Sequence, residues 1–344
     1  MLALLLAAVV YGDPVVAFSF ADPRIDESSG LVSSSTSDGV VFTHNDSGDE
    51  ARFFAVDVSG RTLTTYVLPG VQARDWEDLA RGPDEQGRSS LWLGDIGDNN
   101  ARRDNGILVH RVREPVPGTQ QQVETEPPTS FRLRYPDGPG DAEGLVVHPT
   151  TGRLYVLSKP LAGSTQVYAA PERLDPDGPN RLERVGEVTP RATGTEGGPG
   201  IGGLAQLLVT AADISPDGER LAVRTYTDVY EFTLPGGDLA PGLQTEPVVS
   251  PLPSTRQGEG LAYSRDGRSL LTSTEGRGSP VYRLTAVAAP GDRATPGRQG
   301  SQGQQPVAQE TDDRRGLLLG AAVLALALVV VLARVRRRRS YTPR

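Results

Sequence analysis

Acidic residues recur at one position of a pattern that the sequence repeats five times. The five copies begin ESSGLVSS at Glu27, DWEDLARGP at Asp75, DAEGLVVHP at Asp141, AADISPDG at Ala211 and GEGLAYSRDG at Gly258. Aligned, they place Ser29, Glu77, Glu143, Asp213 and Glu259 at equivalent positions, with Glu27 two residues before the serine. Four carboxylates brought to one axis repel one another unless a cation, water or protonation relieves the charge. Ca²⁺ suits such a site because it takes six to eight oxygen ligands.

A structural role explains the same carboxylates equally well. Buried carboxylates accept hydrogen bonds from backbone N–H groups, and in a ring of repeats those groups belong to the neighbouring copy. The residue types alone favour neither the metal site nor the structural role.

A second acidic set follows the next segment of the first two copies. The sequence NDSGD supplies Asp46 and Asp49, and GDIGDN supplies Asp95 and Asp98. Asp and Asn spaced around Gly are typical of cation-binding loops, but the twelve-residue pattern that ends in Glu is missing. The same residues also form ordinary turns. We expect both acidic sets to lie toward the same end of the fold.

Basic residues occupy comparable places in the repeats. Lys159 is the only lysine in the chain, and Arg224 lies at the corresponding place of the next copy. With Arg74, Arg102 and Arg103 they could bind an anion or a phosphate beside the acidic residues. Isolated arginines are also common on solvated surfaces, so this pattern alone does not establish an anion site.

The elements that must position these residues are short strands. Each copy continues with two β-rich runs, such as VVFTHND and RFFAVDV in the first, and the first three copies show a fourth run. Val, Leu, Tyr and Thr dominate the runs, and turn residues separate them. Four short antiparallel strands repeated in this way predict an all-β fold, a β-propeller whose innermost strands line a central channel.

The number of blades depends on two segments. The fifth copy shows only three runs, and residues 18–21 form an unassigned strand that would close the ring by pairing with the last blade. We therefore predict five blades. The irregular stretch 191–206 leaves six blades open, and its GTEGGPGIGG segment has neither the Lys-Ser/Thr nor the βαβ context of a phosphate-binding loop.

Several of these motifs are shared with a known group of proteins. The segments DAEGLVVHPTTGRLYVLSK and GEGLAYSRDGRSLLTSTEG, with ESSGL and THNDSGD, resemble the phytase-like secreted β-propellers. More loosely, they resemble other bacterial propellers with an E-G-L signature on the inner strand. The resemblance covers residues 27–284 and implies Ca²⁺ bound by acidic residues around the channel, where it helps to hold phosphate. It gives the metal role to Glu77, Glu143, Asp213 and Glu259, and phosphate contacts to Lys159 and Arg224.

Nucleophilic catalysis has little support in the sequence. His44, His110 and His148 lie at unrelated places in the repeats, and no G-x-S-x-G motif is present. The leading hypothesis is a non-enzymatic module that binds a surface protein or a small anionic ligand, with Ca²⁺ near the channel. The rival is a Ca²⁺-dependent phosphoesterase of phytase-like type, in which the metal positions phosphate and activates water.

The C-terminal part predicts a membrane anchor. Residues 316–333 read GLLLGAAVLALALVVVLA, which spans about 27 Å as a helix and approaches the ~30 Å hydrocarbon core. The arginine-rich tail 334–344 places that end in the cytoplasm and the rest of the chain outside. Residues 286–315 are rich in Gly, Pro and Gln and predict a disordered stalk. We thus expect a single-pass protein of the cell membrane.

The N-terminus and the composition complete this prediction. The apolar start of the chain predicts a signal peptide, residues 1–17, cleaved after Ala17, which leaves an ectodomain of residues 18–285. The chain has no cysteine, so its core must stabilise the fold without disulfides. The formal charge is −8, and the six arginines of the acid-free tail leave −14 for the remainder. Such an acidic surface argues against nucleic-acid binding and favours cations.

Overall fold

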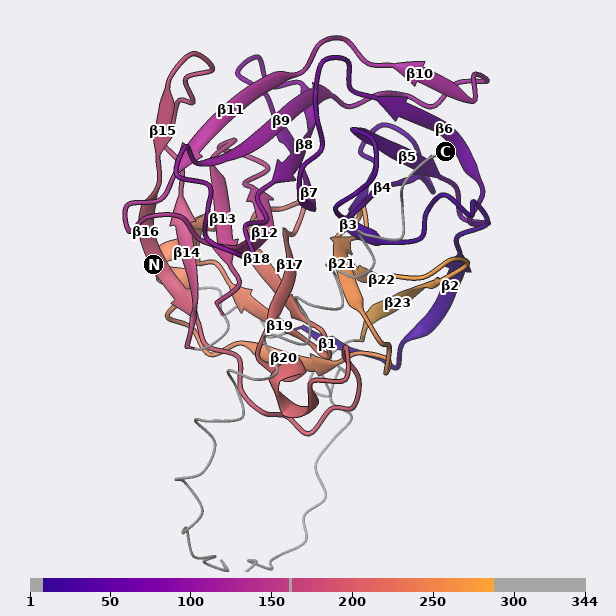
Figure 1. Cartoon of the computed structure of the whole chain (residues 1–344). Coiled ribbons are helices and arrows are strands. Elements are labelled where there is room, and N and C mark those ends of the chain that lie inside the picture. Colours follow the sequence, from indigo (N-terminus) through magenta and orange to yellow (C-terminus); the bar gives the residue numbers. More distant parts are fainter. Residues whose placement is uncertain (1–8, 161–162, 288–344) are drawn as a thin grey trace, which may run out of the picture. The chain divides into compact units, whose positions relative to one another are not determined.

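The computed structural model describes residues 9–160 and 163–287, which form a β-propeller of five sheets arranged around an axis (Figure 1). The main strands of each sheet, apart from the outer strands of the last blade, follow one another in the chain and pair antiparallel, as the repeats predict. The all-β five-bladed fold is therefore confirmed. Residues 189–208, all within the described part, form no strand and only the short 3₁₀ helix η1 (Gly202–Gln206), so they contribute no sixth blade.

The first three blades follow the sequence order from the channel outward. Blade 1 comprises β3 (Ser28–Ser33), β4 (Val41–Asn45), β5 (Arg52–Val56) and β6 (Thr62–Val67). Blade 2 comprises β7 (Trp76–Pro83), β8 (Ser89–Asp95), β9 (Ile107–Arg113) and β11 (Thr129–Arg134). Blade 3 comprises β12 (Ala142–Val147), β13 (Leu154–Ser158), β14 (Thr165–Ala169) and β16 (Glu183–Val188).

The last two blades differ in their outer strands. Blade 4 comprises β17 (Val209–Ile214), β18 (Arg220–Thr225), β19 (Asp228–Thr233) and β20 (Val248–Pro251), and η2 (Pro235–Gly237) and the short α1 (Leu239–Gly242) precede β20. Blade 5 comprises β21 (Gly258–Tyr263), β22 (Ser269–Thr274) and β23 (Pro280–Val287). Its outer strands come from the other end of the chain, β1 (Val10–Tyr11) and β2 (Val15–Ser19).

The pairing of β2 with β23 closes the ring with a strand that precedes blade 1 in the sequence. Val15 pairs with Arg283 and Ser19 with Pro280 in an antiparallel ladder. Closure by the N-terminal strand confirms the expected pairing and ties the two ends of the propeller together. A ring closed in this way exposes no unpaired inner edge.

The propeller begins and ends outside the boundaries expected from the sequence. Strands β1 and β2 include residues before Phe18, so a cut after Ala17 would remove most of the closing strand. At the other end, Ala286 and Val287 pair with Tyr11 and Val10, so the first two residues of the expected stalk belong to blade 5. The expected signal-peptide cleavage itself remains a prediction.

Two short strands that the sequence analysis did not predict extend the outer edges of blades 1 and 2. Strand β10 (Gln122–Glu124) pairs in parallel with β6, and β15 (Pro179–Arg181) pairs in parallel with β11. Each comes from the connection inside the following blade and so reaches back to its neighbour. These contacts cover two outer edges that would otherwise be open to other strands.

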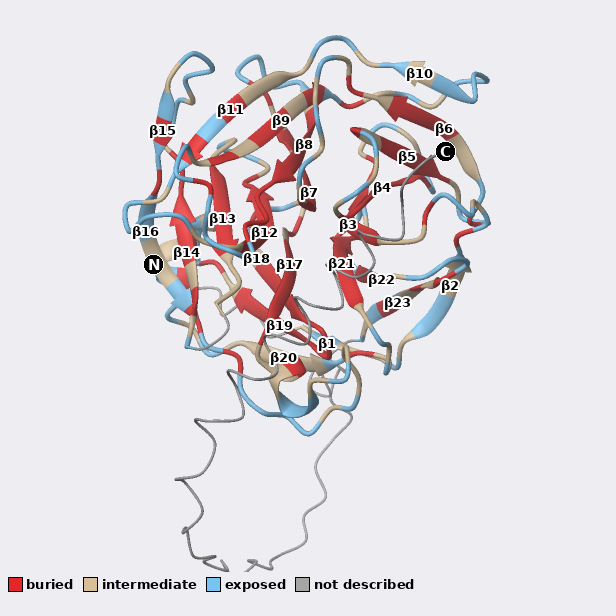
Figure 2. Ribbon diagram, viewed as in Figure 1, coloured by how far each residue is buried: buried red, intermediate tan, exposed pale blue. Residues whose placement is uncertain are grey.

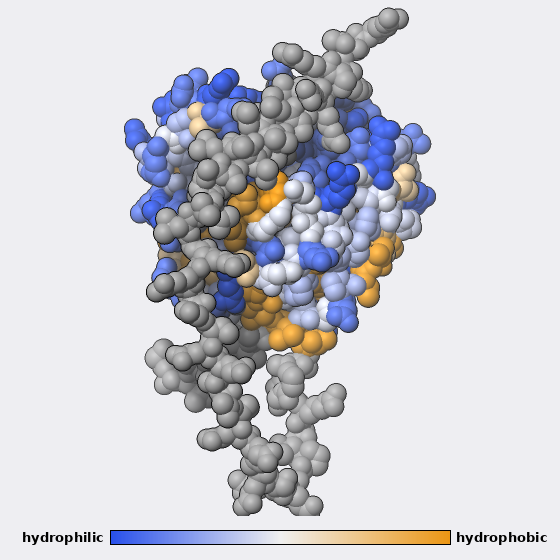
Figure 3. All heavy atoms as spheres, turned by 60° about the horizontal axis from the view of Figure 1, so that its bottom comes forward, coloured by the Kyte–Doolittle hydropathy of each residue, from blue (hydrophilic) through white to orange (hydrophobic). Residues whose placement is uncertain are grey.

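Burial follows the distance from the channel. The inner strands β3, β12 and β21 are buried along their whole length, whereas outer strands such as β2 and β16 are largely exposed or half-buried (Figure 2). Inner strands are buried because the blades on either side pack against both of their faces. On the face shown in Figure 3, hydrophobic side chains reach the surface in separate patches between polar ones.

Within the described ranges, no helix is long and apolar enough to cross a membrane. The expected anchor 316–333, the basic tail 334–344 and the stalk beyond Val287 lie outside the described residues.

Candidate metal centre

A register shift at the start of every inner strand defines equivalent positions in the five blades. The shifts begin at Ser28, Trp76, Ala142, Val209 and Gly258. The next residue in each blade is therefore Ser29, Glu77, Glu143, Thr210 and Glu259. The alignment based on sequence placed Asp213 in this set, but the register gives the place to Thr210. Three carboxylates, rather than four, share the position.

Asp213 lies three residues farther along β17 and has a structural environment. Its Oδ2 accepts a hydrogen bond from the backbone N–H of Tyr263 at 2.8 Å, and its Oδ1 accepts one from Ile214 at 2.8 Å. Burial raises the pKa of Asp213 to about 6, against the effect of these hydrogen bonds and of Arg81. Because it joins blade 4 to the backbone of blade 5, Asp213 serves as a tie between blades.

Asp78 makes an equivalent tie among blades 2, 3 and 4. It accepts hydrogen bonds from the backbone N–H groups of Leu79 at 2.8 Å, Leu145 at 2.9 Å and Ala212 at 3.3 Å. The side chain is fully buried, and this burial raises its pKa well above the usual range. The structural role that the sequence left open therefore exists, but Asp78 and Asp213 fill it.

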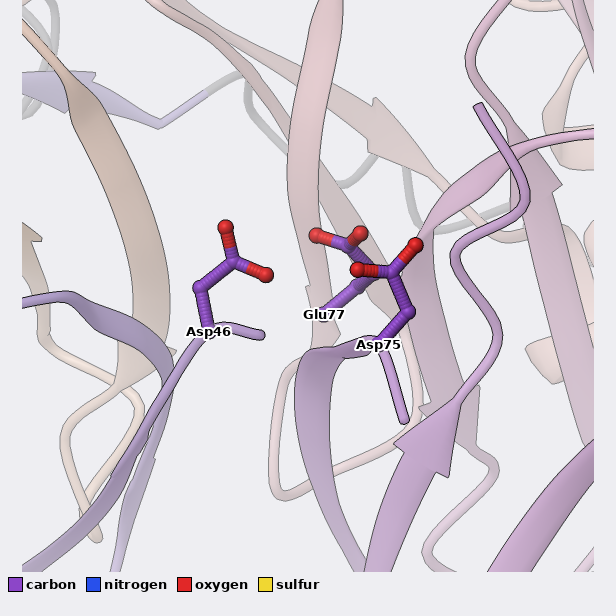
Figure 4. A group of neighbouring side chains, drawn as sticks. All are labelled: Asp46, Asp75 and Glu77. Carbon is purple, nitrogen blue, oxygen red and sulfur yellow. The ribbon is translucent and has the colours of Figure 1, made fainter. Parts of the chain in front are cut away.

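Two groups of carboxylates come together instead at one end of the inner strands. Asp46, Asp75 and Glu77 form the first group, and Glu77, Asp141 and Glu143 form the second. In each group, one oxygen from every residue lies within 4.8 Å of the others. Figure 4 shows the carboxyl groups of the first group turned toward one another. We call the five residues the acidic cluster, and Glu77 belongs to both halves of it.

Local sequence explains how the acidic cluster forms. Asp75 and Glu77 are two residues apart at the start of β7, as are Asp141 and Glu143 at the start of β12. Side chains two apart in extended backbone point to the same side. Asp46 follows β4 and approaches from blade 1. The D-x-E spacing in DWE and DAE is the signal that would have identified Asp75 and Asp141, which the sequence analysis did not name as ligands.

The electrostatics of the cluster are unfavourable without a counter-ion. Burial, then the charges of Asp46, Glu143 and other neighbouring carboxylates, raise the pKa of Glu77 well above its usual range. Burial and Glu143 likewise raise the pKa of Asp141 to about 7, with Lys159 acting in the opposite direction. Glu77 is 1% exposed, and its Oε1 has no hydrogen-bond partner among the described residues. Buried polar atoms are nearly always satisfied, so this oxygen is a candidate ligand for a cation.

Gly97 allows another segment to pass close to the cluster. A side chain there would overlap Oε1 of Glu77 and lie 2.8 Å from the carboxyl carbon of Asp75. The chain after β8 therefore approaches these two carboxylates through a residue without a Cβ. Its backbone N–H donates to the carbonyl of Asp75 at 3.2 Å.

Lys159 neutralises one member of the cluster. Its Nζ lies 2.6 Å from Oε1 of Glu143 and donates to the hydroxyl of Tyr226 at 3.0 Å. The same ammonium lies 5.0 Å from the centre of the Tyr226 ring. The lysine that the sequence analysis assigned to an anion is thus bound to a carboxylate at the cluster.

Arg224 and Glu259 lie on the neighbouring blades. Arg224 is buried and donates from Nη1 to the carbonyl of Ser273 at 2.8 Å and to that of Gly260. Burial lowers the pKa of Arg224 to about 10, while the charge of Glu259 acts in the opposite direction. Burial raises the pKa of Glu259, and its Oε2 has no partner in the described part of the chain. Arg224 therefore supports the backbone of blade 5 and is not exposed to a ligand.

The remaining acidic candidates form local contacts. Asp49 is paired with Arg52 at 2.6 Å, and Asp95 with Arg103 at 2.7 Å. Asp98 accepts backbone hydrogen bonds from Arg102 at 2.9 Å and Arg103 at 2.8 Å. Asp98 also supports the cluster, because its own N–H donates to Asp141 at 2.7 Å. None of these residues belongs to the groups that bring three carboxylates together.

Two other candidates lie next to the cluster. The carbonyl of Glu27 accepts the N–H of Asp46 at 2.9 Å and so positions Asp46 through the backbone. The exposed Arg74 precedes Asp75 in the sequence, and its N–H donates to Asp95 at 3.3 Å. Arg102 is also exposed. Arg74 and Arg102 are therefore the two basic candidates whose side chains are exposed to solvent.

Comparisons with known proteins add little to this description. No model of a known protein family matches the chain, and no curated protein matches it. The chain is similar to the crystal structure of RRP9 WD40 repeats, with 13% identity, 81% of this chain and 100% of that chain covered, and a TM-score of 0.41. It is also similar to a chain of the nidogen/laminin complex, with 13% identity, 73% of each chain covered and a TM-score of 0.39. At these values the likeness carries no argument about function, and the five-bladed fold rests on the strand pairing itself.

Proposed function

We propose that this propeller is a surface-displayed binding module that uses a divalent cation, held by Asp46, Asp75 and Glu77, to bind a protein or a small anionic ligand. Three carboxylates supply part of the oxygen shell of Ca²⁺, which takes six to eight ligands. The remaining positions are open to water or to an oxygen of the bound partner. The exposed Arg74 and Arg102 belong to the segments that border the site and favour an anionic partner.

The observation that carries the proposal is the oxygen of Glu77 that has no hydrogen-bond partner. It is deeply buried beside Asp46 and Asp75, where an unpaired negative charge is costly. A cation supplies the missing interaction and lowers the pKa values that the cluster otherwise raises.

Calorimetric titration of the full-length chain with CaCl₂ tests the proposal. We expect saturable binding that Glu77→Gln weakens at least about tenfold, because the variant loses a charged ligand. Glu114→Gln is the matched control, since Glu114 is buried among Ser34, Ser35 and Ser89 and has no contact with the cluster. Absence of Ca²⁺ binding in the unaltered chain would contradict the proposal.

Display on the cell membrane rests on the sequence of the two ends. The apolar segment 316–333 and the arginines after it favour a single span with the propeller outside. Protease treatment of intact cells that express the chain should remove the propeller and leave the tail protected. Sequencing of the mature N-terminus shows where the signal peptide is cleaved. A mature protein that still contains Val15–Ala17 would contradict the predicted cleavage after Ala17.

A phosphoesterase is the second candidate, favoured by Asp141. Asp141 shares Glu77 with the proposed cation site, and a carboxylate next to a bound cation is placed to act as a general base that activates water. Hydrolysis of p-nitrophenyl phosphate with CaCl₂, lost in Asp141→Asn while Ca²⁺ still binds, would favour this candidate. Ca²⁺ binding without hydrolysis of this or of inositol phosphates would favour the binding module.

A further inference from the structure

We propose that the ammonium of Lys159 permanently fills the second half of the acidic cluster, so that the centre takes one divalent cation and not two. The inference rests on the proposed cation site at Asp46, Asp75 and Glu77. It concerns the other half, formed by Glu77, Asp141 and Glu143, which offers a similar set of oxygens.

The contacts of Lys159 fix its charge at this place. Nζ lies 2.6 Å from Oε1 of Glu143, and the lysine side chain is 9% exposed while that of Glu143 is 1% exposed. Tyr226 supports the ammonium twice, through its hydroxyl at 3.0 Å and its ring at 5.0 Å. A cation held by a carboxylate, a hydroxyl and an aromatic ring in a buried position is not easily released to solvent.

The choice of residue supports the same conclusion. The chain has 35 lysine and arginine residues, and the one lysine among them is found here. An ammonium concentrates its charge on one atom, as a small cation does, whereas a guanidinium spreads its charge over a wide planar group. A compact charge fits this position, where Nζ contacts both Glu143 and the hydroxyl of Tyr226.

Charge balance explains why one divalent ion is sufficient. Lys159 already supplies one positive charge to the half that contains Glu143, so a divalent ion is needed only in the half formed by Asp46, Asp75 and Glu77. The oxygen that has no hydrogen-bond partner belongs to Glu77, which is also part of the half formed with Asp46 and Asp75.

The stoichiometry of CaCl₂ binding to the full-length chain tests the inference. We expect about one ion per chain in the unaltered protein and about two in Lys159→Met, because the second half then offers three carboxylates without a competing charge. Lys159→Gln serves as a second variant if the methionine substitution impairs folding. About two ions in the unaltered chain, or about one in both variants, would overturn the inference.

A second measurement uses the single lysine of the unaltered protein. Acetic anhydride labels exposed amines, and peptide mass spectrometry reports Lys159 separately from the N-terminal amine. We expect slow labelling of Lys159 whose rate changes by less than about twofold when Ca²⁺ is added, because the ion occupies the other half of the cluster. Labelling that accelerates with Ca²⁺ would mean that the ion displaces the lysine and would overturn the inference. Absence of Ca²⁺ binding in the unaltered chain and in both lysine variants would instead reject the proposed function beneath it.

Discussion

Asp78 and Glu77 are adjacent on β7, yet they belong to two different regions of the propeller. Asp78 lies in the interface between blades, where its oxygens meet three backbone N–H groups. Glu77 lies in the acidic cluster, where its neighbours are carboxylates and one of its oxygens has no partner. Burial raises the pKa of both groups, but only one of them has its hydrogen bonds supplied by the protein. A buried carboxylate thus stabilises the fold or prepares a binding site according to what its oxygens contact.

The largest expected effect is the loss of the tie between blades. Asp78→Ala leaves three buried backbone N–H groups without an acceptor, and the free energy of unfolding should fall by about 3 kcal/mol or more. Urea unfolding followed by tryptophan fluorescence measures this change, and Asp78→Asn, which keeps one acceptor oxygen, should lose less. A loss below about 1 kcal/mol in the alanine variant would remove the distinction between the two regions.

The pH-dependent contribution of Asp213 to stability should be smaller than the loss of stability expected for Asp78→Ala. The pKa of Asp213 is raised to about 6, so the folded state binds the proton more tightly than the unfolded state does. Its contribution to stability is therefore present at low pH and is lost as pH rises from about 4 to about 6. The stability difference between the unaltered chain and Asp213→Asn should shrink by about 2 kcal/mol over this interval, since the carboxyl group is only partly buried. Unfolding measured at both ends of the interval checks the sign, and a growing difference would contradict it.

In the acidic cluster, cation affinity should separate two neighbouring aspartates. Asp46→Asn should weaken Ca²⁺ binding about tenfold, or about 1.4 kcal/mol, because it replaces a charged ligand. Asp49→Asn should leave the affinity within about twofold, since Asp49 is already paired with Arg52 at 2.6 Å. Titration with CaCl₂ measures both, and equal effects of the two substitutions would place the ion elsewhere.

The smallest expected effect has the opposite sign to that of Asp78. Glu77→Gln in the presence of a chelator should increase stability by about 1 kcal/mol, because it removes a buried negative charge from among its like neighbours. With saturating CaCl₂ the order should reverse, since only the unaltered chain gains binding energy. Thermal unfolding with and without CaCl₂ checks this. A destabilised variant in chelator would show that the Glu77 carboxylate is structural, like that of Asp78.

The fold could be predicted from the sequence because the pattern of short strands and turns repeats along the chain. The runs around β4, β5 and β13 alternate with turns, and the strand near Phe18 lacked any neighbour in sequence to pair with. The prediction that Asp213 is equivalent to Glu143 was wrong, because the AADISPDG segment was aligned with the other copies three residues out of register. Counting back from Pro149 and Pro216, which follow β12 and β17, would have aligned Glu143 with Thr210.

The sequence by itself predicted an all-β propeller, favoured five blades over six, and indicated the closing strand and the acidic residues on the inner strands, because short strands and turns repeat along the chain. The structure excluded the sixth blade, because residues 189–208 form no strand. Only the tertiary structure decided which carboxylates meet one another and which meet backbone N–H groups. That distinction depends on the register of the paired strands within each blade, because a shift of one residue turns a side chain to the opposite face of its strand. It also depends on how the blades pack against one another. Asp46, Asp75 and Asp141 come from three blades, so the acidic cluster forms only when those blades are packed around one channel. Lys159 follows β13 and Glu143 lies on β12, so their ion pair forms between neighbouring strands of blade 3.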